Sequence, residues 1–123
     1  MPSRWRRLHA RALAATRVAV LLGAAGCDVN VPATEDGGRL FAAMCARCHR
    51  EDGHGNRELG TPDMTTPAWQ GLHPPEIVFA TIVGGSRSKK MPGFGPKTFT
   101  PRQLEALVGH VKAFGVTDPL AGP

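Results

Sequence analysis

The chain has 123 residues and a formal net charge of +5, from 15 Lys and Arg against 10 Asp and Glu. This length accommodates one domain. The excess positive charge lies within the first 17 residues, which carry five arginines and no acid. Residues 27–123 hold ten basic and ten acidic side chains, so their balance gives no reason to expect a nucleic-acid partner.

Residues 1–26 have the layout of an export signal. A basic start is followed by an apolar run at residues 18–25, too short to span a bilayer as a helix. The sequence from Leu22 to Cys27 resembles a bacterial lipobox, although Ala24 stands where that motif usually has Leu. We therefore expect a lipid anchor at Cys27, on the periplasmic face of a membrane of the cell envelope. Ordinary cleavage nearby, with Cys27 as a free thiol, is the alternative.

After the signal we expect a tether at residues 27–35, a helical domain at 36–115 and a tail at 116–123. The first helix begins near Asp36 and runs into residues 45–49, with Leu40, Phe41 and Met44 on one face. Residues 50–56 are rich in Gly and Asx, which is typical of a loop. Three prolines exclude a long helix between residues 60 and 74.

Two further helices follow, and no strand pattern appears. Pro74-Pro75-Glu76 opens the first of them, which ends at Gly84-Gly85. Its expected buried side consists of Ile77, Val78 and Ile82, with Phe79 as a further candidate. Thr100 and Gln103 form a capping box for the last helix, which ends at Gly115. The apolar positions of that helix are Leu104, Leu107, Val108, Val111 and Phe114.

The segment Cys45-Ala46-Arg47-Cys48-His49 is the motif with the most specific chemistry. Cys-x-x-Cys-His is the attachment site of c-type haem. Two thiols on one helical turn can each add to a haem vinyl group, and the adjacent imidazole then binds the iron. A dithiol redox pair or half a zinc site would suit Cys-x-x-Cys alone. The sequence lacks a second Cys pair, so we expect one covalent haem c with His49 as iron ligand.

The chain resembles class I monohaem cytochromes c of bacteria over residues 36–115. The resemblance rests on the haem motif preceded by Gly37 and Phe41, and on five further segments: residues 53–56, 60–64, 66–70, 91–95 and 107–111. It implies an all-α cytochrome c fold, with three or more helices wrapped around one covalent haem. It further implies that Gly37 allows the last helix to cross closely.

The resemblance also implies two contacts around the cofactor. The Pro62 carbonyl would accept a hydrogen bond from the second nitrogen of His49, and the indole N–H of Trp69 could reach a haem propionate. Two positions depart from the family. His110 stands where it usually has Tyr or Trp, and we interpret it as a part-buried packing residue. Met64 stands where it usually has Leu.

The sixth iron ligand is expected to be Met91. It follows His49 by 42 residues, in a Gly- and Pro-rich segment able to approach the far face of the haem. A thioether ligand favours Fe(II) and raises the reduction potential. Met64 is the rival thioether, expected on the His49 side as a flexible gap-filler. The rival imidazoles are His54, His73 and His110.

These residues indicate a membrane-tethered one-electron carrier, not an enzyme, because both axial sites are filled. A haem-containing subunit of a larger respiratory complex is the first alternative. A haem sensor or peroxidase-like enzyme with a labile methionine is the second. Redox partners, membrane-bound or nearby, are expected to dock beside Met91. The basic residues that flank it, with no acid between residues 77 and 104, are Arg87, Lys89, Lys90 and Lys97. They suit an acidic partner.

Overall fold

The computed structural model describes residues 30–116, so the predicted signal, Cys27 and residues 117–123 of the predicted tail lie outside the described part. That part contains five helices and no strand. The helices are α1 (Gly37–Met44), α2 (Ala46–His49), α3 (Pro67–Leu72), α4 (Pro75–Gly84) and α5 (Pro101–Ala113). The all-α prediction is confirmed. None of these helices is long and apolar enough to cross a membrane.

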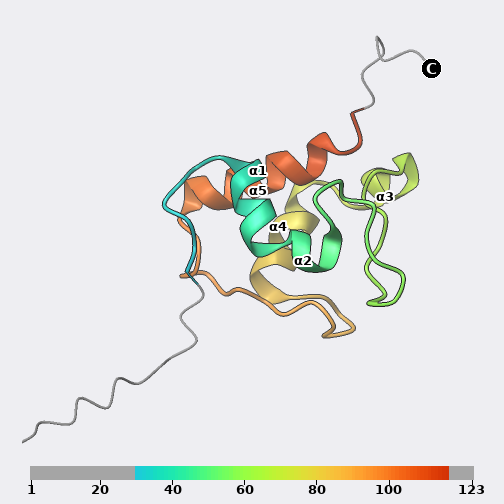
Figure 1. Ribbon diagram of the computed structural model, residues 1–123, viewed down its shortest axis with the longest axis horizontal. Helices are drawn as coiled ribbons and strands as arrows, with labels where there is room; N and C mark the ends of the chain where they lie inside the picture. The colour runs from blue at the N-terminus through green and yellow to red at the C-terminus, as the bar shows by residue number, and fades with distance from the viewer. Residues whose placement is uncertain (1–29, 117–123) are drawn as a thin grey trace, which may run out of the picture.

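The arrangement is a crossed pair of helices with a third packed beside it. In Figure 1, α1 crosses α5, α4 lies behind them, and residues 85–99 run along the lower side. α5 packs against both α1 and α4. The short α3, which the sequence analysis did not expect as a helix, lies to one side (Figure 1). This arrangement brings residues from both ends of the chain around one interior.

Local sequence signals set where the helices begin. The Asp36 carboxylate accepts from the Arg39 N–H at 3.0 Å and caps α1. Thr66 caps α3 in the same way, accepting from the Trp69 N–H at 3.2 Å. Thr100 and Gln103 form the predicted capping box of α5. α4 begins with Pro75 in its first turn, where the missing N–H costs nothing.

The segment before α1 belongs to the folded domain, which differs from the predicted free tether at residues 27–35. The Gln103 side-chain amide is buried and donates to the Pro32 carbonyl at 3.1 Å and the Thr34 carbonyl at 2.9 Å. Val31 packs against the core, and Glu35 pairs with Arg102. Because Gln103 is 69 residues beyond Thr34, this docking could not be predicted from local pattern. Residues 31–35 of the predicted tether therefore contact the folded domain.

The crossing of α1 and α5 depends on Gly37. A Cβ built on Gly37 would lie 2.1 Å from the Ala106 carbonyl oxygen, so any side chain there would force the helices apart. Leu40 and Leu107 are fully buried and Phe41 is 2 % exposed, so the core lies directly beneath this crossing. The predicted role of Gly37 is confirmed.

The buried face predicted for α4 was wrong in part. Val78 and Ile82 form the buried side of α4, but Ile77 is 47 % and Phe79 is 45 % exposed. Val78 and Ile82 are four residues apart and share the face toward the core. Ile77 and Phe79 flank that face. The local pattern of four apolar residues in α4 was not sufficient to say which of them would be covered.

His110 packs at the same crossing, as the sequence analysis expected. Its ring lies 5.1 Å from that of Phe41 and 4.9 Å from that of Phe114, measured between ring centroids. Burial lowers the pKa of His110 below its usual range, and the charge of Asp36 offsets part of that effect. Folding therefore favours the neutral imidazole at this position.

Acidification is expected to weaken the fold through His110. The unfolded chain binds the proton more tightly, so this contribution is complete above about pH 6.5 and is lost as the pH falls toward the folded-state pKa. His110→Phe should reduce the difference between urea midpoints at about pH 5.5 and about pH 7.5. His54→Gln, at an exposed histidine, is the control. An unchanged pH difference in His110→Phe would contradict the prediction.

Candidate functional site

A mostly apolar cavity of about 800 Å³ lies between the helices and the two long connecting segments. This volume is within the range typical of sites for small molecules and cofactors. It brings together four of the predicted site residues, since Cys45, Cys48, His49 and Met91 all line it. Met91 comes from a different segment than the other three, so the tertiary fold creates this grouping.

The break between α1 and α2 places the two cysteines. The helix ends at Met44, Cys45 leaves the helical conformation, and Ala46–His49 forms one further turn. Cys45 is part-buried, and burial, with a smaller effect from Cys48, raises the pKa of its thiol to about 11. Cys48 is exposed. Both thiols therefore line the same cavity. The Cys45 thiol lies inside it and the Cys48 thiol lies at its exposed edge.

His49 presents a neutral imidazole to the cavity. Burial lowers its pKa, which favours the unprotonated form that binds metals. Its Nδ1 atom is buried and has no hydrogen-bond partner among the described residues. The bond expected from Nδ1 to the Pro62 carbonyl is not formed here, although Pro62 also lines the cavity. A buried ring nitrogen of this kind fits a metal-binding histidine whose second nitrogen still needs an acceptor.

The segment after His49 folds back on it through backbone bonds. The Gly55 N–H donates to the His49 carbonyl at 3.0 Å, and the Thr61 hydroxyl donates to the Cys48 carbonyl at 2.8 Å. Gly55 has φ +75°, and a Cβ there would lie 2.3 Å from the Pro62 carbonyl oxygen. Glycine is therefore required where the Pro62 carbonyl passes Gly55. The predicted loop at residues 50–56 thus brings Pro62 beside His49.

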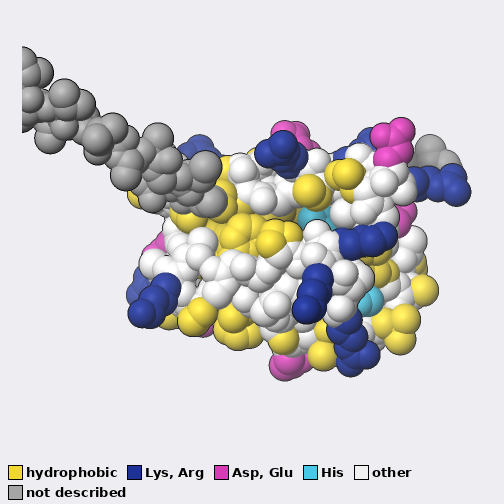
Figure 2. Space-filling model, turned by 90° about the horizontal axis from the view of Figure 1, so that it is seen from below, with side chains coloured by type: hydrophobic (Ala, Val, Ile, Leu, Met, Phe, Trp, Pro, Cys, Tyr) yellow, Lys and Arg dark blue, Asp and Glu magenta, His cyan; other side chains and the backbone are white. Residues whose placement is uncertain are grey.

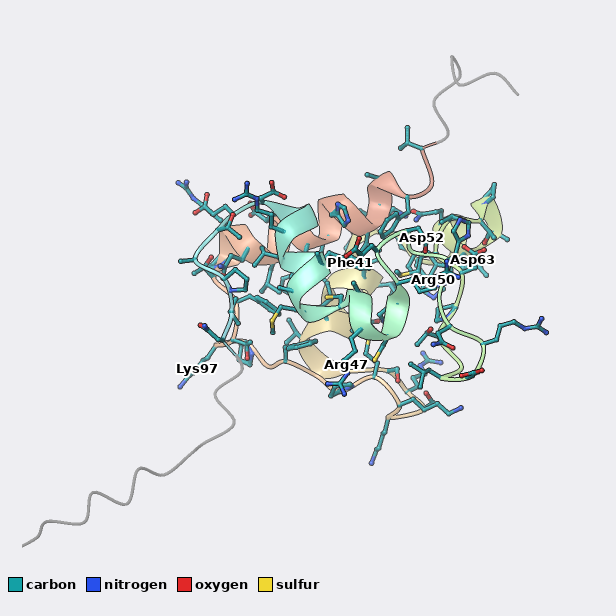
Figure 3. All side chains as sticks on the ribbon, in the orientation of Figure 1. Phe41, Arg47, Arg50, Asp52, Asp63 and Lys97 are labelled. Atoms are coloured by element: carbon teal, nitrogen blue, oxygen red, sulfur yellow. The ribbon has the colours of Figure 1, made fainter. Side chains whose placement is uncertain are left out.

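Hydrogen bonds around Asp63 fix the next part of this segment. Thr65 donates to the Asp63 carboxylate from both its backbone and its hydroxyl, and His54 Nδ1 lies 3.2 Å from Asp63 Oδ2. These bonds lower the pKa of Asp63 to about 2. Asp63 lies with Arg50 and Asp52 near α3 in Figure 3. His54 is thus exposed and absent from the cavity lining, so this rival ligand is not brought to the site.

Met91 lies in a segment that is fixed to the end of α4. Its N–H donates to the Ser86 hydroxyl, and the Ser86 N–H donates to the Met91 carbonyl, both at 3.1 Å. The Phe94 N–H donates to the Ile82 carbonyl at 3.0 Å. Gly93 packs on the Gly84 backbone, where a Cβ would lie 2.6 Å from a backbone carbon. The position of Met91 at the cavity is therefore set by backbone bonds on both sides.

Met64 also lines the cavity, from a different segment than Met91. It is 4 % exposed and part of the core. Its N–H donates to the Gly53 carbonyl, which places it in the segment bonded to the His49 loop. His73 lines the cavity, whereas His110 does not. Of the rival ligands, the fold brings Met64 and His73 to the site.

Trp69 lines the cavity and stacks on His73, with ring centroids 4.2 Å apart and an interplanar angle of 11°. The hydrogen bonds that fix this pair were not predicted from the sequence. Lys112 Nζ donates to the carbonyls of Gln70 and His73 at 2.9 and 2.8 Å. The Gln70 amide donates to the carbonyls of Met64 and Val111. Because these bonds join residues up to 42 apart, no local sequence signal could have revealed them.

The rim of the cavity is basic and partly apolar. Arg87 and Lys90 line it, and no acidic side chain among residues 30–116 does so. Leu59, Leu72 and Ile77 also line it while remaining largely exposed. Figure 2 shows Lys and Arg side chains on this lower side, around an apolar area in which part of a histidine is visible. Arg47 and Lys97 lie on the same side in Figure 3.

Comparison with known proteins identifies the family. A family model described as cytochrome c oxidase, cbb3-type, subunit III, matches residues 32–111. The chain belongs to this family. A cbb3-type cytochrome c oxidase subunit FixP from Azorhizobium caulinodans is 39 % identical over 95 residues, which are 77 % of this chain and 31 % of FixP. The fructose dehydrogenase cytochrome subunit of Gluconobacter japonicus is 30 % identical over 88 residues, 63 % of this chain and 18 % of that subunit.

A solved structure, the KustC0563 c-type cytochrome, agrees with this assignment. It superimposes with a TM-score of 0.58 at 29 % identity, covering 64 % of this chain and 96 % of its own. The cytochrome c fold implied by the resemblance is thereby confirmed. The cofactor of this chain is a covalent c-type haem. Cys45, Cys48 and His49 line the cavity and are placed to hold it. The chain spans less than a third of the length of the curated relatives it matches.

Proposed function

We propose that this chain is a haem-bearing electron-transfer domain that works within a larger respiratory complex. The observation that carries the proposal is the cavity that unites two thiols, one imidazole and one thioether in an otherwise mostly apolar lining. When bound, the haem supplies a reversible one-electron change at its iron. The chain would hold it through Cys45 and Cys48 and would supply iron ligands through His49 and Met91. With both ligands bound, the iron would have no open position for a substrate.

The relatives favour the complex over the membrane-tethered carrier that the sequence first indicated. FixP is by name a subunit of a cbb3-type oxidase, and the Gluconobacter relative is by name a dehydrogenase subunit. We infer the same kind of assembly for this chain, on the periplasmic face of a membrane. Cys27 remains our proposed lipid anchor, with residues 1–26 as its signal.

Membrane fractionation is expected to separate these possibilities. After mild detergent solubilisation, the wild-type chain should co-migrate with other redox subunits on a native gel and stain for covalent haem. Cys27→Ser should be released from the membrane if lipidation anchors it, and Cys27→Ala is the matched second variant. Migration of the haem band as a single small protein would contradict the complex. Retention of both variants on the membrane after the complex has been dissociated would contradict the anchor.

The basic rim is proposed to steer anionic partners to the haem edge. Arg87 and Lys90 are exposed and line the cavity together with Met91, while the acids Asp52 and Asp63 lie toward α3. Surface charge of one sign accelerates encounter with the opposite sign by about tenfold or more at low salt. We thus expect oxidation of the reduced protein by ferricyanide, an anion, to be faster at low salt than at high salt.

Removing positive charges from the rim should weaken this dependence of the ferricyanide rate on salt. Arg87→Gln with Lys90→Gln is expected to slow the ferricyanide reaction about threefold to tenfold at low salt. The control pair, Arg39→Gln with Arg102→Gln, removes the same charge from residues that do not line the cavity. Stopped-flow rates with a cationic cobalt complex should move in the opposite direction. Equal effects of the two pairs would contradict local steering.

A further inference from the structure

The segment that carries Met91 begins with a tight turn, residues 85–91, directly after α4. Residues 87–90 of this turn are all exposed. The Lys89 N–H donates to the Ser86 carbonyl at 2.9 Å, and Lys89 has φ +56°, a left-handed conformation that is unusual for a residue with a side chain. Met91 is the first part-buried residue after this exposed stretch, so the turn brings the chain back to the cavity at Met91.

Backbone contacts close the two ends of this turn. A Cβ on Gly85 would lie 2.8 Å from both the Met91 carbonyl oxygen and the Gly93 nitrogen. Just beyond the turn, the Phe94 N–H donates to the Ile82 carbonyl at 3.0 Å. These contacts use backbone atoms only, so they set where the turn begins and ends without any side chain inside it.

The Ser86 side chain bonds to Met91 within the turn. Its hydroxyl oxygen accepts from the Met91 N–H, and the Ser86 N–H donates to the Met91 carbonyl, both at 3.1 Å. Ser86 therefore pairs with both backbone groups of Met91, while Pro92, the next residue, has no N–H to contribute. Ser86 and Met91 are both part-buried and both line the cavity.

The two bonds between Ser86 and Met91 differ in what they require. The bond to the Met91 carbonyl comes from a backbone N–H, which every residue except proline could donate. The bond from the Met91 N–H requires a side-chain oxygen at residue 86, and without it this part-buried N–H loses its acceptor. Ser88 Oγ lies 3.1 Å from Ser86 Oγ, so the Ser86 hydroxyl can donate to Ser88 while it accepts from Met91.

We propose that Ser86 is a positioning residue for Met91, and that its hydroxyl slows the release of the Met91 thioether from the haem iron. The proposal rests on the electron-transfer function above, with Met91 as the iron ligand. A thioether favours Fe(II), so the oxidised protein is the state in which Met91 is held less firmly by the iron and more by the chain. The bond to the Ser86 hydroxyl leaves the Met91 backbone fewer alternative positions, which favours the bound arrangement by preorganisation.

Cyanide binding to the oxidised holoprotein measures this release. At saturating cyanide the observed rate is the rate at which Met91 leaves the iron, because cyanide takes the position that Met91 vacates. Ser86→Ala is expected to raise this limiting rate about threefold to tenfold, the effect of losing one neutral hydrogen bond. Ser86→Thr keeps a hydroxyl and should restore a rate close to that of the wild type. Stopped-flow absorption of the thioether–iron band follows the reaction.

Ser88→Ala is the matched control because it removes an exposed hydroxyl from the same turn, one that does not bond to Met91. Its limiting rate should stay close to that of the wild type. Urea midpoints of Ser86→Ala and Ser88→Ala should be similar, since the proposed effect is local to the turn. In the wild type, NMR of the reduced holoprotein should show that the Met91 amide hydrogen is protected from exchange with solvent, and Ser86→Ala should lose that protection.

Four results would overturn the positioning role of Ser86. They are a wild-type limiting rate in Ser86→Ala, an equal increase in Ser86→Thr or in Ser88→Ala, an unprotected Met91 amide in the wild type, and a faster rate in Ser86→Ala that is matched by a general loss of stability. Failure of the proposed function would look different. Met91→Ala would then keep the thioether band, or the wild-type holoprotein would lack reversible one-electron chemistry.

Discussion

Met91→Ala is expected to convert the low-spin His/Met haem to a form with an open or water-filled sixth position. The thioether–iron charge-transfer band of the oxidised protein should disappear. The reduction potential should fall by on the order of 100 mV or more, because loss of the soft thioether removes its preference for Fe(II). The expectation follows from the place of Met91 in the cavity wall, with backbone bonds to Ser86 on both its N–H and its carbonyl.

Met64→Leu is the matched comparison, since Met64 lines the same cavity and is buried in the core. It should retain the thioether band and shift the potential little, because Leu preserves volume and apolar character. Visible absorption and potentiometric titration of both variants decide the assignment. Loss of the band in Met64→Leu with retention in Met91→Ala would show that Met64 is the ligand.

Carbon monoxide gives an independent measurement of the same assignment. The wild-type ferrous protein should not bind it at neutral pH, because the Met91 segment is held by bonds to α4 and Ser86. Met91→Ala should bind it readily. Binding by the wild type would favour the sensor or peroxidase-like alternative over electron transfer.

Gly37→Ala is expected to be the most damaging single methyl addition in the domain. The added Cβ would lie 2.1 Å from the Ala106 carbonyl oxygen, a backbone atom that cannot rotate away. α1 and α5 would have to separate above Leu40 and Leu107, which are fully buried. We expect a loss of about 3 kcal/mol, a large part of the stability of a small domain.

Gly109→Ala is the control because it lies in α5 and meets no atom within 4 Å. It should stabilise the protein by about 0.5–1 kcal/mol through helix propensity. Urea unfolding of both holoproteins, followed by far-UV circular dichroism, measures the difference. Equal stability of the two variants would mean that the helices do not cross at Gly37 as closely as the structure shows.

The elements that local chemistry controls were predictable. Asp36, Thr100 and Gln103 cap their helices through bonds to residues three positions away, so sequence spacing is enough to find them. The Cys45–His49 motif needs only one helical turn, and it identified the cofactor that the family assignment then confirmed. In α4, the apolar run predicted a helix and its covered residues Val78 and Ile82, but not that Phe79 would be 45 % exposed.

By itself, the sequence determined the haem, its two thiols and His49, because covalent attachment and the proximal ligand lie within five consecutive residues. The tertiary structure decided which other residues meet them. It placed Met91 and Met64 in one cavity, docked residues 31–35 on Gln103, and joined Gln70 and His73 to Lys112 across 42 and 39 residues. Such contacts depend on how the helices cross. Gly37 allows α1 and α5 to cross closely, but the local sequence pattern does not specify which residues that crossing brings together.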